Sequence, residues 1–488
     1  MDNLENTNIF DDDFSDTKTE IALSVKEKEV TEEITKSELI DLAAKALDEQ
    51  KKKNEKSIEY KYIFRTDGDT LHYMHFRKEG SILYKWNNQY HEEQSEEVVK
   101  ANIAKWLKGN VPNKFNSKNV NSIYQMLLHT VKPFETTKMT EIIIPTKDNW
   151  LLVNDKTGDI TAIKPDRSKP IRHQINYVVS KPGKFEIPKL GKSKYFDDFI
   201  NSSMADVEKR NIIQEYAGYS FCSDVRKQTM LMFVGKGANG KSIFIEVLAS
   251  VHSKPVSVRI DKVHEYNNNL IDASLIYCTE TNKRGFDQEF IKQAVAGDKV
   301  EIRGIYSKKQ NAYITAKWIM IMNDMPRIDD YSDGMFRRVK IITWDKQFDG
   351  KNGNPQPIDN LAQLIINNDT EHFINWCLEG LQRLIRNGWS FTKSNDVEKA
   401  LFDWKNSMDK VSLFVNEFNY QYSADQKLYT FKNDIFDRFN RWAEENYFEK
   451  MNSTTFWNRM KNIFPESKNE GEKKINGKRI TYIRQVPQ

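Results

Sequence analysis

The sequence has few cysteines and no long apolar run. Three of its 488 residues are cysteine (Cys222, Cys278 and Cys377), and they lie far apart. An odd, scattered set of thiols indicates buried cysteines in a reducing compartment, and it argues against a disulfide framework or a zinc site. No stretch approaches the roughly 18 apolar residues of a membrane span, and the acidic N-terminus lacks the basic and apolar parts of a signal peptide. We therefore expect a cytoplasmic protein without a membrane partner.

A large excess of one charge is also absent, but the charges are unevenly distributed. The 74 Lys and Arg against 70 Asp and Glu leave a net charge of +4, too small to indicate a nucleic-acid partner by itself. Residues 1–20, however, carry seven acidic residues against one lysine, which is typical of a disordered segment. Residues 450–488 carry nine Lys or Arg against three Glu, a net of +6, which is typical of a nucleic-acid-binding surface.

One stretch combines a strand, a glycine-rich turn and a helix. Apolar residues 230–234 run into the turn, and apolar residues recur at helical spacing after it. The turn matches the pattern G-x-x-x-x-G-K-S, in which backbone N–H groups and a helix N-terminus surround phosphates. The lysine of this pattern reaches the β- and γ-phosphates, and its serine binds Mg²⁺. The residues predicted to bind ATP are Gly235, Gly237, Ala238, Asn239, Gly240, Lys241 and Ser242.

The same letters allow other interpretations. Gly235, Gly237 and Gly240 also spell the dinucleotide pattern G-x-G-x-x-G, and Asp261 follows an apolar run at about the distance of a ribose-binding acid. A glycine-rich turn without a ligand is the third alternative. The Lys-Ser pair directly after Gly240 favours a nucleoside triphosphate, because only the first pattern requires it.

Further polar groups follow or precede strand-like runs downstream. Glu280 ends a buried run, where phosphate-loop ATPases carry a carboxylate that lies beside Mg²⁺ and orients the attacking water. Asn323 ends a later run, and its amide suits a hydrogen bond to that water or to the γ-phosphate. Arg337 and Arg338 precede another run. Planar arginine donors suit the charge on a transferred phosphoryl group and often come from a neighbouring subunit.

A β-hairpin is predicted within residues 290–314, with Lys308 and Lys309 at its polar tip and Arg303 before it. Exposed lysines at a hairpin tip are usually solvated, although they also suit the phosphates of a threaded single strand.

Residues 60–65 and 70–76 also read as strands, around an Asp-Gly turn. Asp67 and Asp69 allow the metal pair of a primase, but no third acid or histidine motif follows, so a structural turn is favoured.

The ordered set resembles the superfamily 3 helicases, and in particular the phage, plasmid and poxvirus primase-associated type. The residues that carry the resemblance are the loop 235–242, Glu280, the stretch around Gly297, Asn323 and Arg337-Arg338, with segments 149–158 and 214–219 upstream. The basic C-terminal end adds a likeness to the replication initiator-helicases of phage-related mobile genetic islands. The sequence departs from the family at Thr279, where a second acid is common, and at Ala296, where a second glycine is common.

The resemblance implies an AAA+-like hexameric ring that hydrolyses ATP with Mg²⁺ at subunit interfaces and threads single-stranded DNA through its channel. It makes Glu280 the catalytic base and, with Ser242, a neighbour of Mg²⁺. It makes Asn323 the sensor and Arg337 the arginine finger, with Arg338 as the alternate. Primase chemistry is not visible, so a primase or host replication proteins would be separate partners.

We expect a multidomain chain: an acidic segment over residues 1–55, an α+β accessory domain over 56–185, an α/β phosphate-loop ATPase domain over 186–390 and a C-terminal winged-helix domain over 395–488. The last rests on a capped helix from Ser453 and a basic hairpin around Asn476-Gly477. A winged helix puts such a helix in the major groove and touches phosphates with its wing. The predicted DNA-binding residues are Arg459, Lys461, Lys478 and Arg479; the alternative is a solvated basic tail.

The sequence thus predicts an ATP-dependent DNA helicase and replication initiator that binds double-stranded origin DNA and unwinds it by threading one strand. The alternative is an origin- or operator-binding protein in which ATP drives oligomerisation without unwinding. Another nucleic-acid motor is a weaker option.

Overall fold

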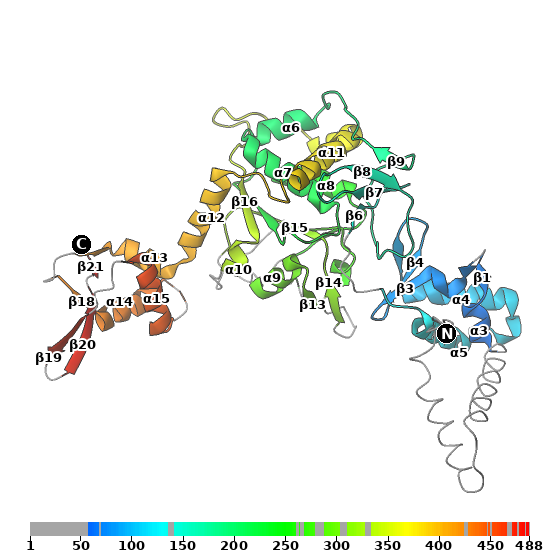
Figure 1. Ribbon diagram of the computed structural model, residues 1–488, viewed down its shortest axis with the longest axis horizontal. Coiled ribbons are helices and arrows are strands. Elements are labelled where there is room, and N and C mark those ends of the chain that lie inside the picture. Colours follow the sequence, from blue (N-terminus) through cyan, green and yellow to red (C-terminus); the bar gives the residue numbers. More distant parts are fainter. Residues whose placement is uncertain are drawn as a thin grey trace, which may run out of the picture. The chain divides into compact units, whose positions relative to one another are not determined.

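The computed structural model describes residues 57–487 except 68–69, 135–140, 260–262, 264–267, 279–286, 303–309, 327–332, 424–427, 447, 449–450, 466–470, 476–477 and 484 (Figure 1). The chain forms two compact units. One comprises residues up to Trp86 together with Glu93–Phe134, and the other comprises Asn87–Glu92 together with Glu135–Gln488. In the part of the chain that is described, no helix is long and apolar enough to cross a membrane.

In its described residues, the first unit packs helices and a β-hairpin around its own hydrophobic core, which includes Ile63, Ile103, Ile123 and Leu127. The helices begin at side-chain caps, which satisfy backbone N–H groups of the first turn. Its elements are α3 (Ile58–Ile63), β1 (Thr66–Asp67), β2 (Thr70–Leu71), η1 (His72–His75), β3 (Phe76–Glu79), β4 (Ile82–Trp86), α4 (Glu96–Asn110), η2 (Pro112–Lys114) and α5 (Ser117–Thr130). Strand β5 (His91–Gln94) lies at the division between the units.

The structure shows that the prediction of a strand over residues 60–65 is wrong, because most of this stretch belongs to helix α3. Ser57 caps the helix by accepting a hydrogen bond from the Tyr60 N–H at 3.0 Å. Helical spacing brings the rings of Tyr60 and Phe64 together, with centroids 4.5 Å apart. Aromatic and β-branched residues favour strands only where they fit a half-buried pleated surface, and tertiary packing overrides that preference here.

Strands β1 and β2 pair antiparallel, so the observed pairing involves residues 66–67 and 70–71 and not the predicted strands 60–65 and 70–76. His72 and His75, however, lie on the 3-10 helix η1 and not on a strand. The Asp67 carboxylate lies 2.5 Å from His72 Nδ1 and 3.4 Å from Arg65 Nε. Burial lowers the pKa of His72 to about 4. These contacts make Asp67 part of a structural network, which agrees with the favoured interpretation of this turn.

A five-stranded parallel sheet is the centre of the second unit. Its order is β11-β12-β15-β10-β16, with β10 (Met230–Val234), β11 (Pro255–Ser257), β12 (Leu275–Cys278), β15 (Lys317–Met322) and β16 (Val339–Thr343). Near-continuous apolar runs are typical of such strands because both faces are covered. The associated elements are α6 (Phe196–Ser203), α7 (Val207–Ser220), α8 (Lys241–Val251), η4 (Asn268–Leu270), α9 (Gln288–Ala296), α10 (Asp333–Phe336) and α11 (Leu361–Arg386).

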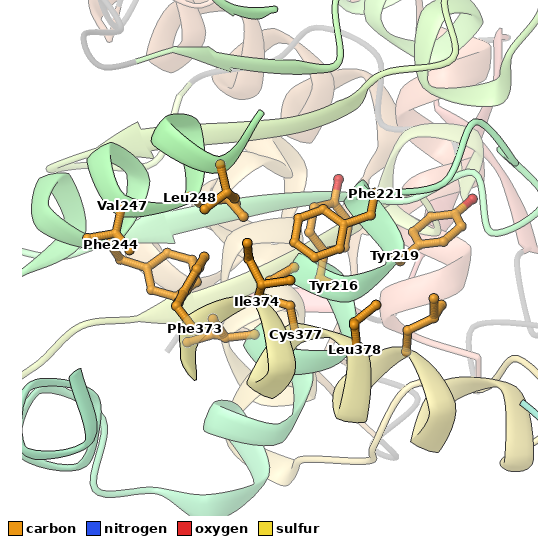
Figure 2. Close-up of a cluster of buried hydrophobic side chains, with 14 of the residues drawn as sticks. Tyr216, Tyr219, Phe221, Phe244, Val247, Leu248, Phe373, Ile374, Cys377 and Leu378 are labelled. Atoms are coloured by element: carbon orange, nitrogen blue, oxygen red, sulfur yellow. The ribbon is translucent and has the colours of Figure 1, made fainter. Parts of the chain in front are cut away.

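Helices α7 and α11 approach so closely that two positions have no room for a side chain. A Cβ on Gly218 would lie 2.0 Å from the Cys377 carbonyl oxygen, and one on Gly380 would lie 2.3 Å from the Gln214 carbonyl oxygen. Figure 2 shows the apolar cluster around this crossing, in which side chains of α7, α8 and α11 meet. The crossing gives a structural reason for Gly218, one of the residues in segment 214–219.

A four-stranded antiparallel sheet, β6-β7-β8-β9, belongs to the second unit. Its strands are β6 (Ile142–Ile144), β7 (Trp150–Val153), β8 (Ile160–Ile163) and β9 (Gly183–Phe185). Ile144 and Leu151 are buried in the same core as Phe233 of the parallel sheet. The first unit ends at Phe134, so this sheet lies outside it, and the accessory domain of residues 56–185 stays a prediction.

The C-terminal part has its own aromatic core, which includes Phe414, Phe439, Trp442 and Phe456. Its elements are α12 (Asn395–Met408), α13 (Lys410–Glu417), β17 (Tyr420–Tyr422), β18 (Thr430–Phe431), α14 (Lys432–Glu445), α15 (Ser453–Ile463), β19 (Gly471–Ile475), β20 (Lys478–Ile483) and β21 (Gln485–Pro487). Strands β18, β20 and β19 form a three-stranded sheet in that order, and β17 pairs with β21.

Candidate functional site

The glycine-rich turn lies at the carboxyl edge of the parallel sheet. Val234, the last residue of β10, is opposite Met322 of β15 and Thr343 of β16. The Gly235 N–H donates to the Met322 carbonyl at 3.3 Å, which brings the start of the turn beside Asn323. In open parallel sheets, ligands bind outside the carboxyl ends of the strands. The loop of residues 235–240 therefore lies where this architecture places a ligand.

The backbone of the loop explains two of its glycines. Gly240 caps α8 with φ of +90°, and a Cβ there would lie 2.9 Å from the Phe199 ring. A Cβ on Gly235 would lie 2.4 Å from the Trp344 carbonyl oxygen and 2.5 Å from Asn239 Nδ2. Gly237 is different, since no atom lies within 4 Å of the position that a Cβ on it would take. Of these three glycines, protein packing therefore requires Gly235 and Gly240 but not Gly237 in this conformation.

Lys241 and Asn239 form a hydrogen-bonded pair inside the loop. Lys241 is 4% exposed, and its ammonium donates to the Gly235 carbonyl at 2.5 Å and to Asn239 Oδ1 at 2.9 Å. Burial lowers the pKa of Lys241. The Asn239 amide in turn donates to the Trp344 carbonyl at 3.0 Å. Asn239 therefore connects the lysine to the end of β16.

The segment after β16 holds the loop from the other side. The Trp344 N–H donates to the Val234 carbonyl at 2.7 Å, and the Phe348 N–H donates to the Ala238 carbonyl at 2.7 Å. Gln347 Nε2 donates to the Gly237 carbonyl at 3.2 Å. We name residues 344–348 the anchor segment. Apart from Gln347, it orders the loop through backbone groups, which every residue carries and which therefore leave no signature in the sequence.

A buried lysine joins the end of β16 to two helices. The Lys209 side chain on α7 is 6% exposed, and its Nζ lies 2.9 Å from Thr343 Oγ1. Its ammonium also pairs with Asp345 at 3.4 Å and with Asp396 of α12 at 3.3 Å. Two carboxylates offset the cost of burying the charge. The sequence did not reveal the contacts of Lys209, or the hydrogen bond from Asn239 to the Trp344 carbonyl, because the partner residues lie more than a hundred positions away in the chain.

Of the other predicted site residues, some lie at the carboxyl edge of the sheet and others are outside the described residues. Ser242 is exposed in the first turn of α8, and Asn323 is exposed directly after β15. Both therefore lie at the carboxyl edge with the loop. Glu280 lies outside the described residues, as do Arg303, Lys308 and Lys309. The predicted hairpin itself is present, since β13 (Lys299–Ile302) pairs antiparallel with β14 (Gln310–Tyr313).

Arg337 and Arg338 lie at the opposite edge of the sheet. They precede Val339, which is opposite Met230 at the start of β10. Five residues of strand separate that level from the loop, a distance of roughly 16 Å. The arginines and the loop of one chain are therefore not in one site.

The two arginines also differ from each other. Arg338 is half-buried, and its guanidinium donates to the Gly334 carbonyl within its own turn. Burial, followed by the nearby charge of Arg337, lowers the pKa of Arg338. Arg337 is exposed. Of the pair, Arg337 is the one whose side chain is available to another molecule.

Strand order argues against the dinucleotide interpretation. A dinucleotide site needs the acid after the second strand beside the phosphate-binding turn of the first, because one ligand spans both. Strand β11, which precedes Asp261 in the sequence, is separated from β10 by β12 and β15. Three strand spacings amount to roughly 14 Å. Asp261 itself lies outside the described residues.

In the C-terminal part, the basic residues predicted to bind DNA lie on a helix and a strand. Lys461 is exposed on α15, whereas Arg459 is half-buried. Lys478 and Arg479 begin β20, and Arg479 is opposite Lys474 of β19. Phe456 and Met460 of α15 are buried, so that the helix packs on one face and leaves the other exposed.

Comparisons with known proteins found little. A family of unknown function (DUF5906) matches residues 233–338. No curated protein matches the sequence. Among solved structures, the chain is similar to the apo structure of the NrS-1 C-terminal region (305–718), with 13% identity, a TM-score of 0.44 and coverage of 84% of this chain and 96% of that one. It is also similar to a JCV helicase structure, with 9% identity, a TM-score of 0.25 and coverage of 45% and 63%. Likenesses this weak carry no argument about function.

Proposed function

We propose that this protein is an ATP-dependent DNA helicase and replication initiator that works as a hexamer. The observation that carries the proposal is the loop between β10 and α8. It lies at the carboxyl edge of a parallel sheet, it holds a buried lysine, and packing forbids a side chain at Gly235 and Gly240. A helix N-terminus and backbone N–H groups at such a loop favour the phosphates of ATP.

In the proposed reaction, Lys241 leaves the carbonyl of Gly235 and binds the β- and γ-phosphates. The proposal is supported by the present hydrogen bonds of the ammonium, which donates to two oxygens of the loop itself, the Gly235 carbonyl and Asn239 Oδ1. Asn323, exposed next to Gly235, is positioned to bind the γ-phosphate or the attacking water. Glu280 is proposed as the base that orients this water.

Magnesium fits this set of donors. The exposed hydroxyl of Ser242 in the first turn of α8 and the carboxylate of Glu280 would hold it, and bound Mg²⁺ would neutralise charge on the β- and γ-phosphates.

Completion of the site by a neighbouring subunit is supported by the position of the arginines. Because Arg337 and Arg338 lie at the far edge of the sheet, a finger for this loop has to come from another copy of the chain. We propose that Arg337, which is exposed, is this finger, and that Arg338 stabilises its own turn through its hydrogen bond to the Gly334 carbonyl. A ring of such contacts explains why ATP hydrolysis would require assembly.

DNA is the proposed substrate at two places. The β13–β14 hairpin would present Arg303, Lys308 and Lys309 to a threaded single strand. The C-terminal helices and the β18-β20-β19 sheet have the element order of a winged helix, in which α15 enters the major groove and the β19–β20 turn contacts phosphates. This part would recognise the double-stranded origin.

The test is ATP hydrolysis with and without single-stranded DNA, for the wild-type chain and for Lys241→Ala. We expect hydrolysis that DNA stimulates and that the variant loses. Hydrolysis indifferent to DNA would support the alternative, an origin-binding protein in which ATP drives oligomerisation. No ATP turnover and no ATP binding would contradict both.

A further inference from the structure

Residues 98–134 of the first unit contain six lysines and no Asp or Glu. Acids and bases are nearly balanced in the whole chain, so such a run is unusual. It covers most of α4, the turn after it and α5, which pack together as an antiparallel pair (Figure 1). Charge of one sign is therefore concentrated on one helical hairpin.

Four of these lysines gather where α4 ends and α5 begins. We name residues 105–118 the α4–α5 tip. Its exposed basic residues are Lys105, Lys108, Lys114 and Lys118. Among the described residues, none of the four has an acidic partner. Lys100, by contrast, pairs with Glu96 one turn earlier on α4. Glu96 lies nine residues before Lys105, a distance of roughly 14 Å along the helix.

The tip also presents neutral polar groups and an aromatic ring. Phe115 is 41% exposed, and the ammonium of Lys108 lies 4.6 Å from the centre of its ring. Asn110, Asn113 and Asn116 are exposed beside it. An exposed ring among lysines and amides is the combination with which proteins bind single strands: the ring stacks on a base and the ammonium groups contact phosphates.

The backbone of the tip is fixed in advance. The Lys114 N–H donates to the Val111 carbonyl at 2.9 Å, and the Phe115 N–H donates to the Pro112 carbonyl at 3.1 Å. Asn119 Nδ2 donates to the Lys114 carbonyl at 2.6 Å. Because the turn is already ordered, binding would not have to order it, which lowers the entropic cost of association.

From these observations we infer that the α4–α5 tip is a third nucleic-acid surface, which binds the phosphate backbone of single-stranded DNA and stacks a base on Phe115. It is distinct from the hairpin and the C-terminal part. It rests on the proposed function, since unwinding supplies the single strand. A duplex fits the surface less well, because its stacked bases are not available to an aromatic ring.

The experiment measures binding of a fluorescent oligo(dT) of about 20 nucleotides to the full chain without nucleotide, between about 50 and 200 mM salt. The tip variant is Lys105→Gln/Lys114→Gln. The control, Lys61→Gln/Lys132→Gln, removes equal charge from exposed lysines elsewhere in the same unit. Each lost phosphate contact lowers the slope of log K against log salt by about 0.7. We therefore expect the tip variant to lose about 1.4 of slope and about 25-fold in affinity at 0.1 M salt.

A third variant separates stacking from charge. Phe115→Leu keeps an apolar side chain and every lysine. Since stacking of one base contributes about 1–3 kcal/mol, we expect affinity to fall at least about fivefold with an unchanged salt slope. The control double variant should bind as the wild type does.

The outcomes separate this inference from the proposed function. If the chain binds oligo(dT) but the tip variant behaves as the control does, the inference is wrong and the helicase proposal stands. If no variant and no wild-type chain binds single-stranded DNA, the proposed function fails first. If the tip variant loses affinity for duplex DNA only, the surface binds duplex and the inference is wrong. The inference is also wrong if carbodiimide cross-links the tip lysines to the acids of residues 1–20 and the tip variant binds oligo(dT) as the control does once those residues are removed, because the surface then binds that segment.

Discussion

Replacement of Gly235 by alanine is expected to disconnect the loop from the end of β16. The new Cβ would lie 2.5 Å from Asn239 Nδ2 and 2.4 Å from the Trp344 carbonyl oxygen, and would collide with both. Displacing Asn239 removes its hydrogen bond to Trp344 and its bond to the ammonium of Lys241. A neutral hydrogen bond contributes about 0.5–1.5 kcal/mol and one to a charged group about 1.5–3 kcal/mol.

The two losses amount to about 2–4.5 kcal/mol, which corresponds to roughly 30- to 1,600-fold in a local equilibrium. Hydrogen exchange followed by mass spectrometry measures this directly, because local opening sets the exchange rate of the Phe348 N–H that bonds Ala238. We expect exchange in the anchor segment to accelerate by that factor, together with a loss of ATP hydrolysis.

The matched control is Gly237→Ala, two residues along the same loop. No atom lies within 4 Å of the position its Cβ would take, so exchange in the anchor segment should stay close to that of the wild type. Equal acceleration in both variants, or none at Gly235→Ala, would refute the packing argument.

Three other outcomes are expected. Arg337→Ala should abolish ATP hydrolysis in a ring made only of that variant. Mixing it with Lys241→Ala should restore part of the hydrolysis, because an Arg337→Ala subunit supplies the intact loop and its Lys241→Ala neighbour supplies the intact finger. If mixing restores no hydrolysis, the trans arrangement is contradicted. Gly218→Ala should unfold the second unit at a markedly lower temperature, as its Cβ would lie 2.0 Å from a carbonyl oxygen of α11; a change within about 1 °C would contradict the close crossing. Burial lowers the pKa of His173 and His252 to about 3, so below pH 6.5 the unfolded chain takes up protons that the folded chain does not, and the free energy of unfolding falls as the pH drops from 6.5 toward 3. At pH 5 each histidine should lower the free energy of unfolding by about 2 kcal/mol. Replacing both by Gln should therefore make the melting temperature less sensitive to acid pH.

The strand, loop and helix around Gly240 were predictable because they are adjacent in the chain, so their apolar periodicity and glycine pattern can be read locally. The hairpin of β13 and β14 was predictable for the same reason, since period-two runs flank a polar turn. The helix α3 was not, because Tyr60, Tyr62 and Phe64 favour a strand by type and only their packing selects the helix.

The sequence by itself determined which groups are present at the loop and the order in which Asn323 and the two arginines follow. Only the tertiary structure decided where those groups lie. Strand order inserts β15 between β10 and β12 and brings Asn323 beside Gly235, whereas the direction of β16 leaves Arg337 at the opposite edge. The contacts of Lys209, Asn239 and the anchor segment likewise depend on elements remote in the chain. A sequence pattern records side-chain types at short range, but parallel strands bring together the ends of segments separated by a hundred residues, often through backbone groups that every residue carries.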